Sequence, residues 1–152
     1  MAYALPDRLM PSKPIPPCGP PAHPGEAQET PPLPPWAAVE DRLAELAALP
    51  ADWNDDGAPP ISAIALRVTR QLLLARPPLV GLGDLFPSPD GGVLMEYIRG
   101  TWDLTVEVGA DGTLEIFGFE IGGTGKLYPK PYPVMAAEFL RALDAAGGPA
   151  WR

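Results

Sequence analysis

The chain of 152 residues is 46% hydrophobic and 20% charged, which is enough apolar material for one packed domain. Its 11 basic and 19 acidic residues give a formal net charge of −8 at pH 7, which argues against a protein whose main task is to grip nucleic acid or an anionic membrane. The single cysteine excludes an intrachain disulfide framework and a cysteine-based zinc site, and no apolar run reaches the ~18 residues of a membrane span.

Residues 1–35 predict an extended arm that precedes the folded domain. They contain 12 of the 23 prolines, which exclude helix interiors and central strands and favour polyproline II. Two interpretations stand: a solvated tail, or a strap that lies on a partner or on a neighbouring copy of the chain. No basic stretch followed by an apolar one opens the chain, so we expect no signal peptide and a cytoplasmic protein.

Two helices are expected at the start of the folded domain, which we place at residues 36–152. The first is indicated by apolar side chains at helical spacing and is ended by Pro50. The second is predicted from about Ser62, as its N-cap, to Ala75. The stripe of the first helix is Trp36, Val39, Leu43 and Leu46, and the expected buried face of the second is Ile64, Ala65, Val68, Leu72 and Leu73.

Between the helices lies an acidic loop, residues 51–60, that matches the first half of a calcium-binding loop. Asp52, Asn54 and Asp56 are followed by Gly57, as that chemistry needs, but the twelfth position is Ala63 where a bidentate acid is required. The second half of the motif is therefore missing, and we expect no metal. The structural interpretation is a tight turn in which Trp53 fills the gap between the two helices.

The second half of the domain predicts a three-stranded antiparallel meander and a last helix. The strands are expected at Val93–Ile98, Thr101–Val108 and Thr113–Phe119, joined by the turns Arg99-Gly100 and Asp111-Gly112. Residues 79–91 are predicted to be a connector, 122–133 to be irregular, and about 134–145 to be helical. The fold class is therefore α+β: an extended proline-rich arm, two N-terminal helices, the meander and a C-terminal helix.

The turns also suggest a row of carboxylates across the sheet. With two-residue loops, Tyr97 faces Trp102, and Glu96 faces Asp103 on the opposite side, with Glu120 next in line. A bulged second turn instead pairs Val106 with Ile116 and breaks this row. If the row exists, its like charges must be balanced by solvent, a cation or a basic partner. The structural interpretation is that these acids only form a solvated polar face.

Little in the sequence supports catalysis. The only histidine, His23, and the only cysteine, Cys18, lie in the arm without a partner that can be placed on the fold. Adjacent carboxylates on an open sheet offer no pocket to separate their pKa values, and the glycines before Lys126 are not followed by the Ser or Thr of a phosphate loop. We therefore expect no catalytic residues and no cofactor.

Two segments resemble a family of small bacterial proteins without an established activity. The family pattern is Trp-Asp/Asn-x-x-Gly-Ala-x-Pro-Ile, then a helix, then Pro-x-x-Gly-Gly-Ile/Val-x-Leu-Glu-Trp/Tyr and a meander. This chain matches it at Trp53–Ile61 and at Pro89–Tyr97, with Met95 at the Leu position, and the likeness covers about half of its length, from Leu46 to Phe119. The size of the members is similar to that of antitoxins, immunity proteins and accessory factors of mobile elements, an associational link only.

These observations predict a non-enzymatic protein-binding module, a small acidic accessory subunit or an antitoxin-like or immunity-like partner in a bacterial complex. We expect a protein partner, which is basic if charge directs the contact. We expect no direct binding to nucleic acid or to a membrane, and a homo-oligomer is compatible with the sequence. The alternatives are a structural subunit strapped by its arm and a metal-assisted hydrolase. The expected partner-binding residues, which include two tyrosines of a proline-rich run, are Trp53, Asp55, Asp56, Glu96, Asp103, Glu120, Tyr128 and Tyr132.

Overall fold

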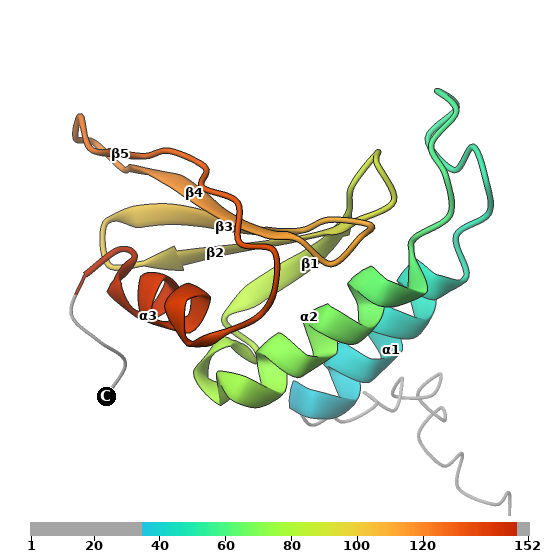
Figure 1. Ribbon diagram of the computed structural model, residues 1–152, viewed down its shortest axis with the longest axis horizontal. Coiled ribbons are helices and arrows are strands. Elements are labelled where there is room, and N and C mark those ends of the chain that lie inside the picture. Colours follow the sequence, from blue (N-terminus) through green and yellow to red (C-terminus); the bar gives the residue numbers. More distant parts are fainter. Residues whose placement is uncertain (1–34, 149–152) are drawn as a thin grey trace, which may run out of the picture. The chain divides into compact units, whose positions relative to one another are not determined.

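The computed structural model describes residues 35–148, so almost all of the predicted arm, with Cys18 and His23, lies outside the described residues. The described elements, drawn in Figure 1, are α1 (Pro35–Ala47), α2 (Ala63–Ala75), η1 (Pro77–Leu79), β1 (Gly83–Pro87), β2 (Val93–Arg99), β3 (Trp102–Val108), β4 (Leu114–Glu120), β5 (Lys126–Leu127) and α3 (Ala137–Ala145). The α+β class is confirmed. The three-stranded meander is wrong, because within these residues the sheet has five strands.

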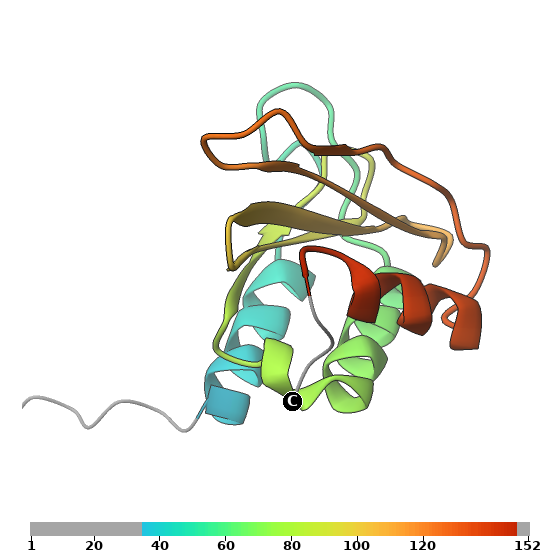
Figure 2. The ribbon, with the colours of Figure 1, turned by 90° about the vertical axis from the view of Figure 1, so that its left-hand side faces the viewer.

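The strands form one antiparallel sheet in the order β1-β2-β3-β4-β5. All three described α-helices lie on the same side of this sheet, which we call the inner face (Figures 1 and 2). No described helix covers the opposite side, the outer face. No helix among residues 35–148 is long and apolar enough to cross a membrane.

The two strands that the sequence analysis missed are the edge strands. β1 is only five residues long, is bounded by Gly83 and Pro87, and buries a single side chain, Leu85. β5 is two residues long and lies within a glycine- and proline-rich segment. Alternation between the two faces of a sheet is the signal of a strand, and strands of five and two residues, in segments that contain glycine and proline, are too short to show it.

The registers of the two long hairpins differ from those that two-residue turns at Arg99-Gly100 and Asp111-Gly112 would give. Arg99 pairs with Trp102, so Gly100 and Thr101 form the first turn and Tyr97 pairs with Leu104. This shift of two residues along the partner keeps every side chain on its predicted face, because the side-chain period of a strand is two. The predicted row of acids is broken at both hairpins: Glu96 pairs with Thr105 and not with Asp103. At the second turn Val106 pairs with Ile116, which is the bulged alternative.

The inner face and the helices enclose one core. Leu43 and Leu46 of α1 are buried as expected, and so are Ala65, Leu72 and Leu73 of α2. α2 also buries Thr69, whereas Ile64, which was expected on the buried face, is exposed. The Thr69 hydroxyl donates to the Ala65 carbonyl at 2.8 Å, and this local bond lets a polar residue occupy the buried stripe. α3 begins three residues later than predicted. The strands and α3 contribute Val93, Met95, Tyr97, Leu104, Val106, Val108, Leu114, Ile116, Phe139 and Leu143.

An ion pair ties the end of α2 to α3. Arg76 donates to both carboxylate oxygens of Asp144, at 2.6 and 2.7 Å, and this bond raises the pKa of Arg76. Arg99 of β2 donates to the backbone carbonyls of Asp144 and Ala146, so the sheet holds the C-terminal end of the same helix. Arginine suits this position because its planar fork can hold a carboxylate in two bonds.

Burial raises the pKa of the nearby Tyr97 hydroxyl to about 12, with Arg99 opposing and Asp144 adding to the shift. The folded state thus holds the phenol proton more tightly than the unfolded chain does. The wild type is expected to lose roughly 2–3 kcal/mol relative to Tyr97→Phe as the pH rises from about 10 to about 12. Urea unfolding of both proteins at pH 9 and pH 12 measures this difference, and free energies that change in parallel would contradict it.

Candidate functional site

The outer face of the sheet combines carboxylates with large apolar side chains. Its residues are those that alternate with the core residues along each strand, together with one lysine from β5. The only basic side chain that strands β1 to β5 place on this face, among the described residues, is Lys126 opposite Phe119. The residues of the outer face are Asp84, Phe86, Leu94, Glu96, Ile98, Asp103, Thr105, Glu107, Glu115, Phe117, Phe119 and Lys126.

Two pairs of acids face each other directly across neighbouring strands of this surface. Asp84 of β1 pairs with Glu96 of β2, and Glu107 of β3 pairs with Glu115 of β4. Like charges directly opposite each other on a sheet are destabilising. None of these four carboxylates takes part in the ion pairs found among the described residues. The outer face therefore carries an excess of negative charge that the described part of the chain does not neutralise.

The apolar side chains between these acids are open to solvent. Ile98 is 57% exposed and Phe119 is 53% exposed, although both belong to regular strands. Ile98 lies beside Asp103, which in turn pairs with Phe119, so that an acid stands between two apolar side chains. A shallow depression of about 350 Å³ at this end of the face is lined by Leu82, Asp84, Glu96, Tyr97, Ile98 and Asp103.

The acids that line this depression differ from those of the predicted row. Glu96 and Asp103 are present, but the third acid is Asp84, which the missed strand β1 supplies. Glu120 pairs with Trp102, and its carboxylate accepts the Gly125 N–H at the β4–β5 turn. Glu120 is thus the last residue of β4, and its carboxylate closes the β4–β5 turn and does not lie on the outer face. Alternating apolar and polar residues before Pro87 would have indicated a strand and placed Asp84 on its outer side, but β1 is too short to show such a pattern.

The two tyrosines of the proline-rich run have different places. Tyr128 is 74% exposed, as a partner-binding residue must be. Tyr132 is only 8% exposed, forms a bridge with Leu114 at the edge of β4, and packs edge-on against Phe139 with ring centroids 5.5 Å apart. Tyr132 is part of the core, so this segment covers a sheet edge at one point and offers one tyrosine to solvent.

The acidic loop between α1 and α2 is held by its own side chains. The Asp52 carboxylate accepts the Gly57 N–H at 2.7 Å, and the Asn54 amide oxygen accepts the N–H groups of Asp56 and Ala58. Oxygens that a calcium loop would turn toward the ion are thus used to close the turn. Trp53 donates its indole N–H to the Pro59 carbonyl and is half-buried within the loop, rather than filling the gap between the helices.

The two halves of the family-like pattern meet in space at the base of this loop. Ser62 donates its backbone N–H to the Gly91 carbonyl at 2.8 Å and its hydroxyl to the Ala110 carbonyl at 2.6 Å. Gly91 has a φ of +84°, and a side chain there would press on Pro59. The pattern therefore joins the loop to the β1–β2 and β3–β4 turns, which accounts for it structurally without assigning an activity.

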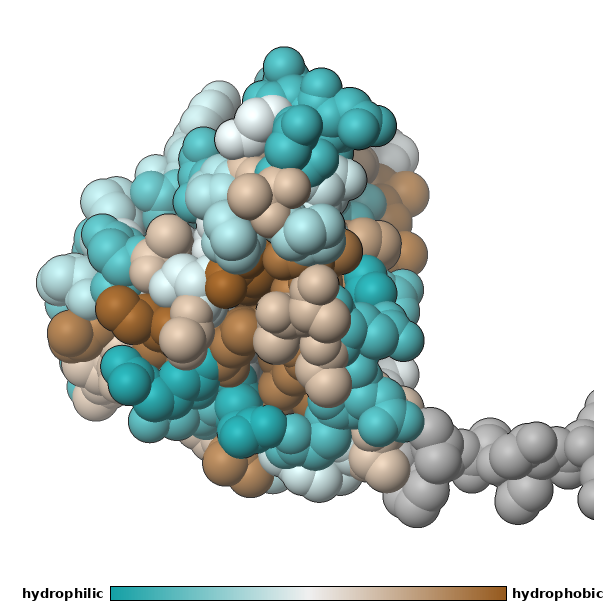
Figure 3. Space-filling view, turned by 90° about the vertical axis from the view of Figure 1, so that its right-hand side faces the viewer, coloured by the Kyte–Doolittle hydropathy of each residue, from teal (hydrophilic) through white to brown (hydrophobic). Residues whose placement is uncertain are grey.

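The tip of the loop remains hydrophilic and accessible. Asp55 and Asp56 are exposed, and Asp55 has a φ of +57°, which its short polar side chain allows. Seen from the end where the loop projects, hydrophilic residues cover the tip and hydrophobic residues gather below it (Figure 3). The loop thus adds negative charge at one end of the described domain, on a turn closed by its own hydrogen bonds.

Residues 35–148 contain no group of three histidine, cysteine, aspartate or glutamate side chains placed to hold a metal ion. The three acids of the depression do not form such a group. Comparison with known proteins adds no relative: no protein-family model, no curated protein and no solved structure matches the chain.

The acid pair of β1 and β2 makes a direct prediction about stability. Glu96→Gln is expected to raise the free energy of unfolding by about 0.5 kcal/mol, because it removes a like charge opposite Asp84. The gain should shrink in about 1 M salt, where the charges are screened. Asp90→Asn, an exposed turn position outside the sheet, is the matched control. Urea unfolding at neutral pH measures all three proteins, and a destabilised Glu96→Gln would refute the repulsion.

Proposed function

We propose that this chain is a non-enzymatic protein-binding module, a small acidic accessory subunit whose outer face binds a basic protein partner. The observation that carries the proposal is the pair of like-charge contacts, Asp84–Glu96 and Glu107–Glu115, on a sheet face that no described helix covers. Such pairs reduce the stability of the isolated fold, whereas a cationic side chain of a partner placed between the two carboxylates would be attracted to both.

The apolar part of the same face supports a protein as the partner. Ile98 and Phe119 are more than half exposed and are separated by an acid, which is the mixture of apolar contact area and charge found at protein interfaces. A small cation would use the carboxylates alone and leave these side chains in water. Neutralisation of a basic protein, as an antitoxin or an immunity protein does, is the most specific form of this proposal, and a cytoplasmic location belongs to it.

The two alternatives have less support in the described residues. A structural subunit strapped by its arm depends on residues 1–34, which lie outside them. A metal-assisted hydrolase would need a set of converging ligands and a concave site, and the acids of the outer face line only a shallow depression. The likeness to the small bacterial family is compatible with the binding role, and membership remains part of the proposal.

Site-specific cross-linking tests the proposed face. A photoreactive residue in place of Ile98 should capture a basic protein in the native cell, whereas the same residue in place of Leu74, which is exposed on α2, should not. Capture at both positions, or of an acidic protein at Ile98, would count against the outer face as the interface.

Charge reversal then tests the role of the acids. Glu96→Lys together with Asp103→Lys is expected to lower the association rate with the captured protein by about tenfold or more, because charge complementarity steers encounter. The matched control is Asp41→Lys together with Asp90→Lys, two exposed acids that lie outside the sheet and outside the ion pairs of the described residues. Surface plasmon resonance at two salt concentrations gives the rates. An unchanged rate in the double variant would remove charge as the basis of binding.

A further inference from the structure

β1 is an edge strand with hydrogen-bonding groups directed away from the sheet. Arg42 of α1 donates its Nε–H to the Leu85 carbonyl at 3.0 Å, so this carbonyl points away from β2. In an antiparallel ladder the N–H and C=O of one residue point to the same side, and the direction alternates along the strand. The N–H groups of Gly83 and Leu85 therefore also face outward, where a further strand could pair with them.

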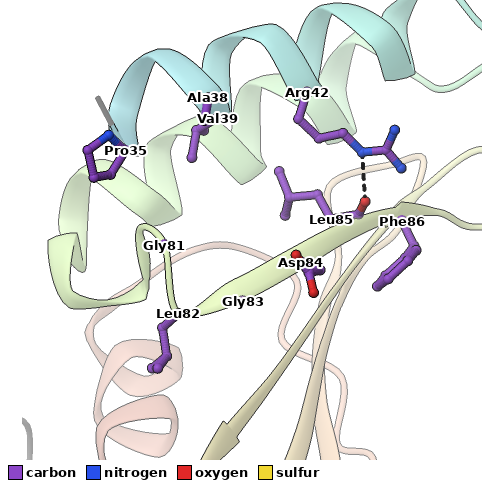
Figure 4. Close-up of a pocket in the computed structure, with 10 residues that line it drawn as sticks. All are labelled: Pro35, Ala38, Val39, Arg42, Gly81, Leu82, Gly83, Asp84, Leu85 and Phe86. Carbon is purple, nitrogen blue, oxygen red and sulfur yellow. Dashed lines mark hydrogen bonds between the residues drawn. The ribbon is translucent and has the colours of Figure 1, made fainter. Parts of the chain in front are cut away.

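A groove runs beside this edge. Its volume is about 750 Å³, and its two walls are the segment 81–86 and one stripe of α1. The stripe consists of Pro35, Ala38, Val39 and Arg42, at the i, i+3, i+4 and i+7 spacing of a single helix face. Figure 4 shows these side chains and that of Leu85 directed into the space between helix and strand, with Arg42 reaching across to the Leu85 carbonyl.

The walls specify the side chains that an added strand would carry. Residues beside Leu85 would lie over Ala38 and Val39, where the groove is apolar. Residues beside Asp84 would lie on the outer face next to the Asp84–Glu96 pair, where the surface is acidic. Because successive side chains of a strand point to opposite faces, the fitting segment alternates apolar and basic residues.

We propose that the groove between α1 and β1 takes up an extended segment of a partner protein, with alternating apolar and basic side chains, as a sixth strand paired with the edge of β1. This inference rests on the proposed binding function and gives it a mode. The N–H groups of Gly83 and Leu85 would donate to the segment, and one of its own N–H groups would take the place of Arg42 at the Leu85 carbonyl. Ala38 and Val39 would receive its apolar side chains, and Asp84 with Glu96 would receive its basic ones.

The test uses the full chain and a defined probe, the peptide acetyl-Val-Lys-Val-Lys-Val-Lys-amide. Amide exchange of Gly83 and Leu85, followed by NMR, should slow by about tenfold or more when the peptide is saturating, because both N–H groups become hydrogen-bonded. Ala38→Leu should weaken binding by about tenfold by filling the groove, while Ala44→Leu, an exposed position elsewhere on the same helix, should leave it within about twofold. The same peptide with Glu for Lys should bind at least about tenfold more weakly.

Three results would overturn the inference. The first is a peptide that binds without slowing exchange at Gly83 and Leu85. The second is no binding at millimolar peptide, and the third is protection of these amides in the chain alone, which would mean that its own residues or a second copy occupy the edge. None of these results bears on the outer-face proposal, which the cross-linking at Ile98 tests separately. Conversely, a failed cross-link at Ile98 would not contradict a peptide that binds and protects the amides of Gly83 and Leu85.

Discussion

Phe139→Ala is expected to lower the free energy of unfolding by about 3–5 kcal/mol. Phe139 is fully buried in α3, and its ring meets that of Tyr132 at an angle of 70°. α3 is only nine residues long and its N-cap, Ala136, makes no side-chain cap, so the helix depends on packing rather than on its own termini. The substitution leaves a large cavity where α3 and the segment that precedes it are both fixed to the sheet.

Urea unfolding of Phe139→Ala and of Leu74→Ala gives the comparison. Leu74 is 59% exposed on α2, so its loss should cost no more than about 0.5 kcal/mol. Because α3 lies on the inner face, folded Phe139→Ala should keep wild-type affinity for the basic partner that we propose for the outer face. A loss below about 1 kcal/mol, or weaker binding of the folded protein, would show that the two faces are not divided as described.

The elements that could be predicted from the sequence are those with a strong period. Buried and open residues alternate along β2 and β3. The register of this hairpin differs from the predicted one by two residues, but each side chain stays on its predicted face because a strand repeats every second position. α1 and α2 were located by their stripes and by Pro50 and Ser62. The buried side of α2 was misjudged at Thr69 and Ile64, because hydropathy alone does not count the bond from Thr69 to the Ala65 carbonyl.

The candidate site could be predicted only in part. Glu96 and Asp103 were found because they alternate with core residues in long strands. Asp84 was missed with its strand, and the edge groove with it, because a short glycine- and proline-bounded edge strand has no pattern to detect. Tyr132 was misplaced for a different reason: a tyrosine between prolines is compatible with a surface or with a covered edge, and only the contact with Phe139 decides between them.

Gly118→Ala is expected to destabilise the fold by about 3 kcal/mol, because it places a methyl group where two strands lie in contact. Gly118 pairs with Leu104, and an added Cβ would overlap the Asp103 carbonyl oxygen and stand 3.1 Å from the Leu104 Cα. Both are backbone atoms, so a side-chain rotation cannot relieve the contact and β3 must separate from β4. A glycine within a strand commonly marks such a close approach.

The matched control distinguishes this contact from the general cost of replacing glycine. Gly122 lies in the turn after β4 with a φ of +73°, and an added Cβ there would meet no atom within 4 Å. Gly122→Ala should therefore cost only about 1 kcal/mol, from its backbone conformation. Thermal and urea unfolding of both variants supply the comparison. Equal losses would mean that β3 and β4 are free to adjust at this point, and the fixed spacing of Asp103 and Phe119 on the outer face would then lose its structural basis.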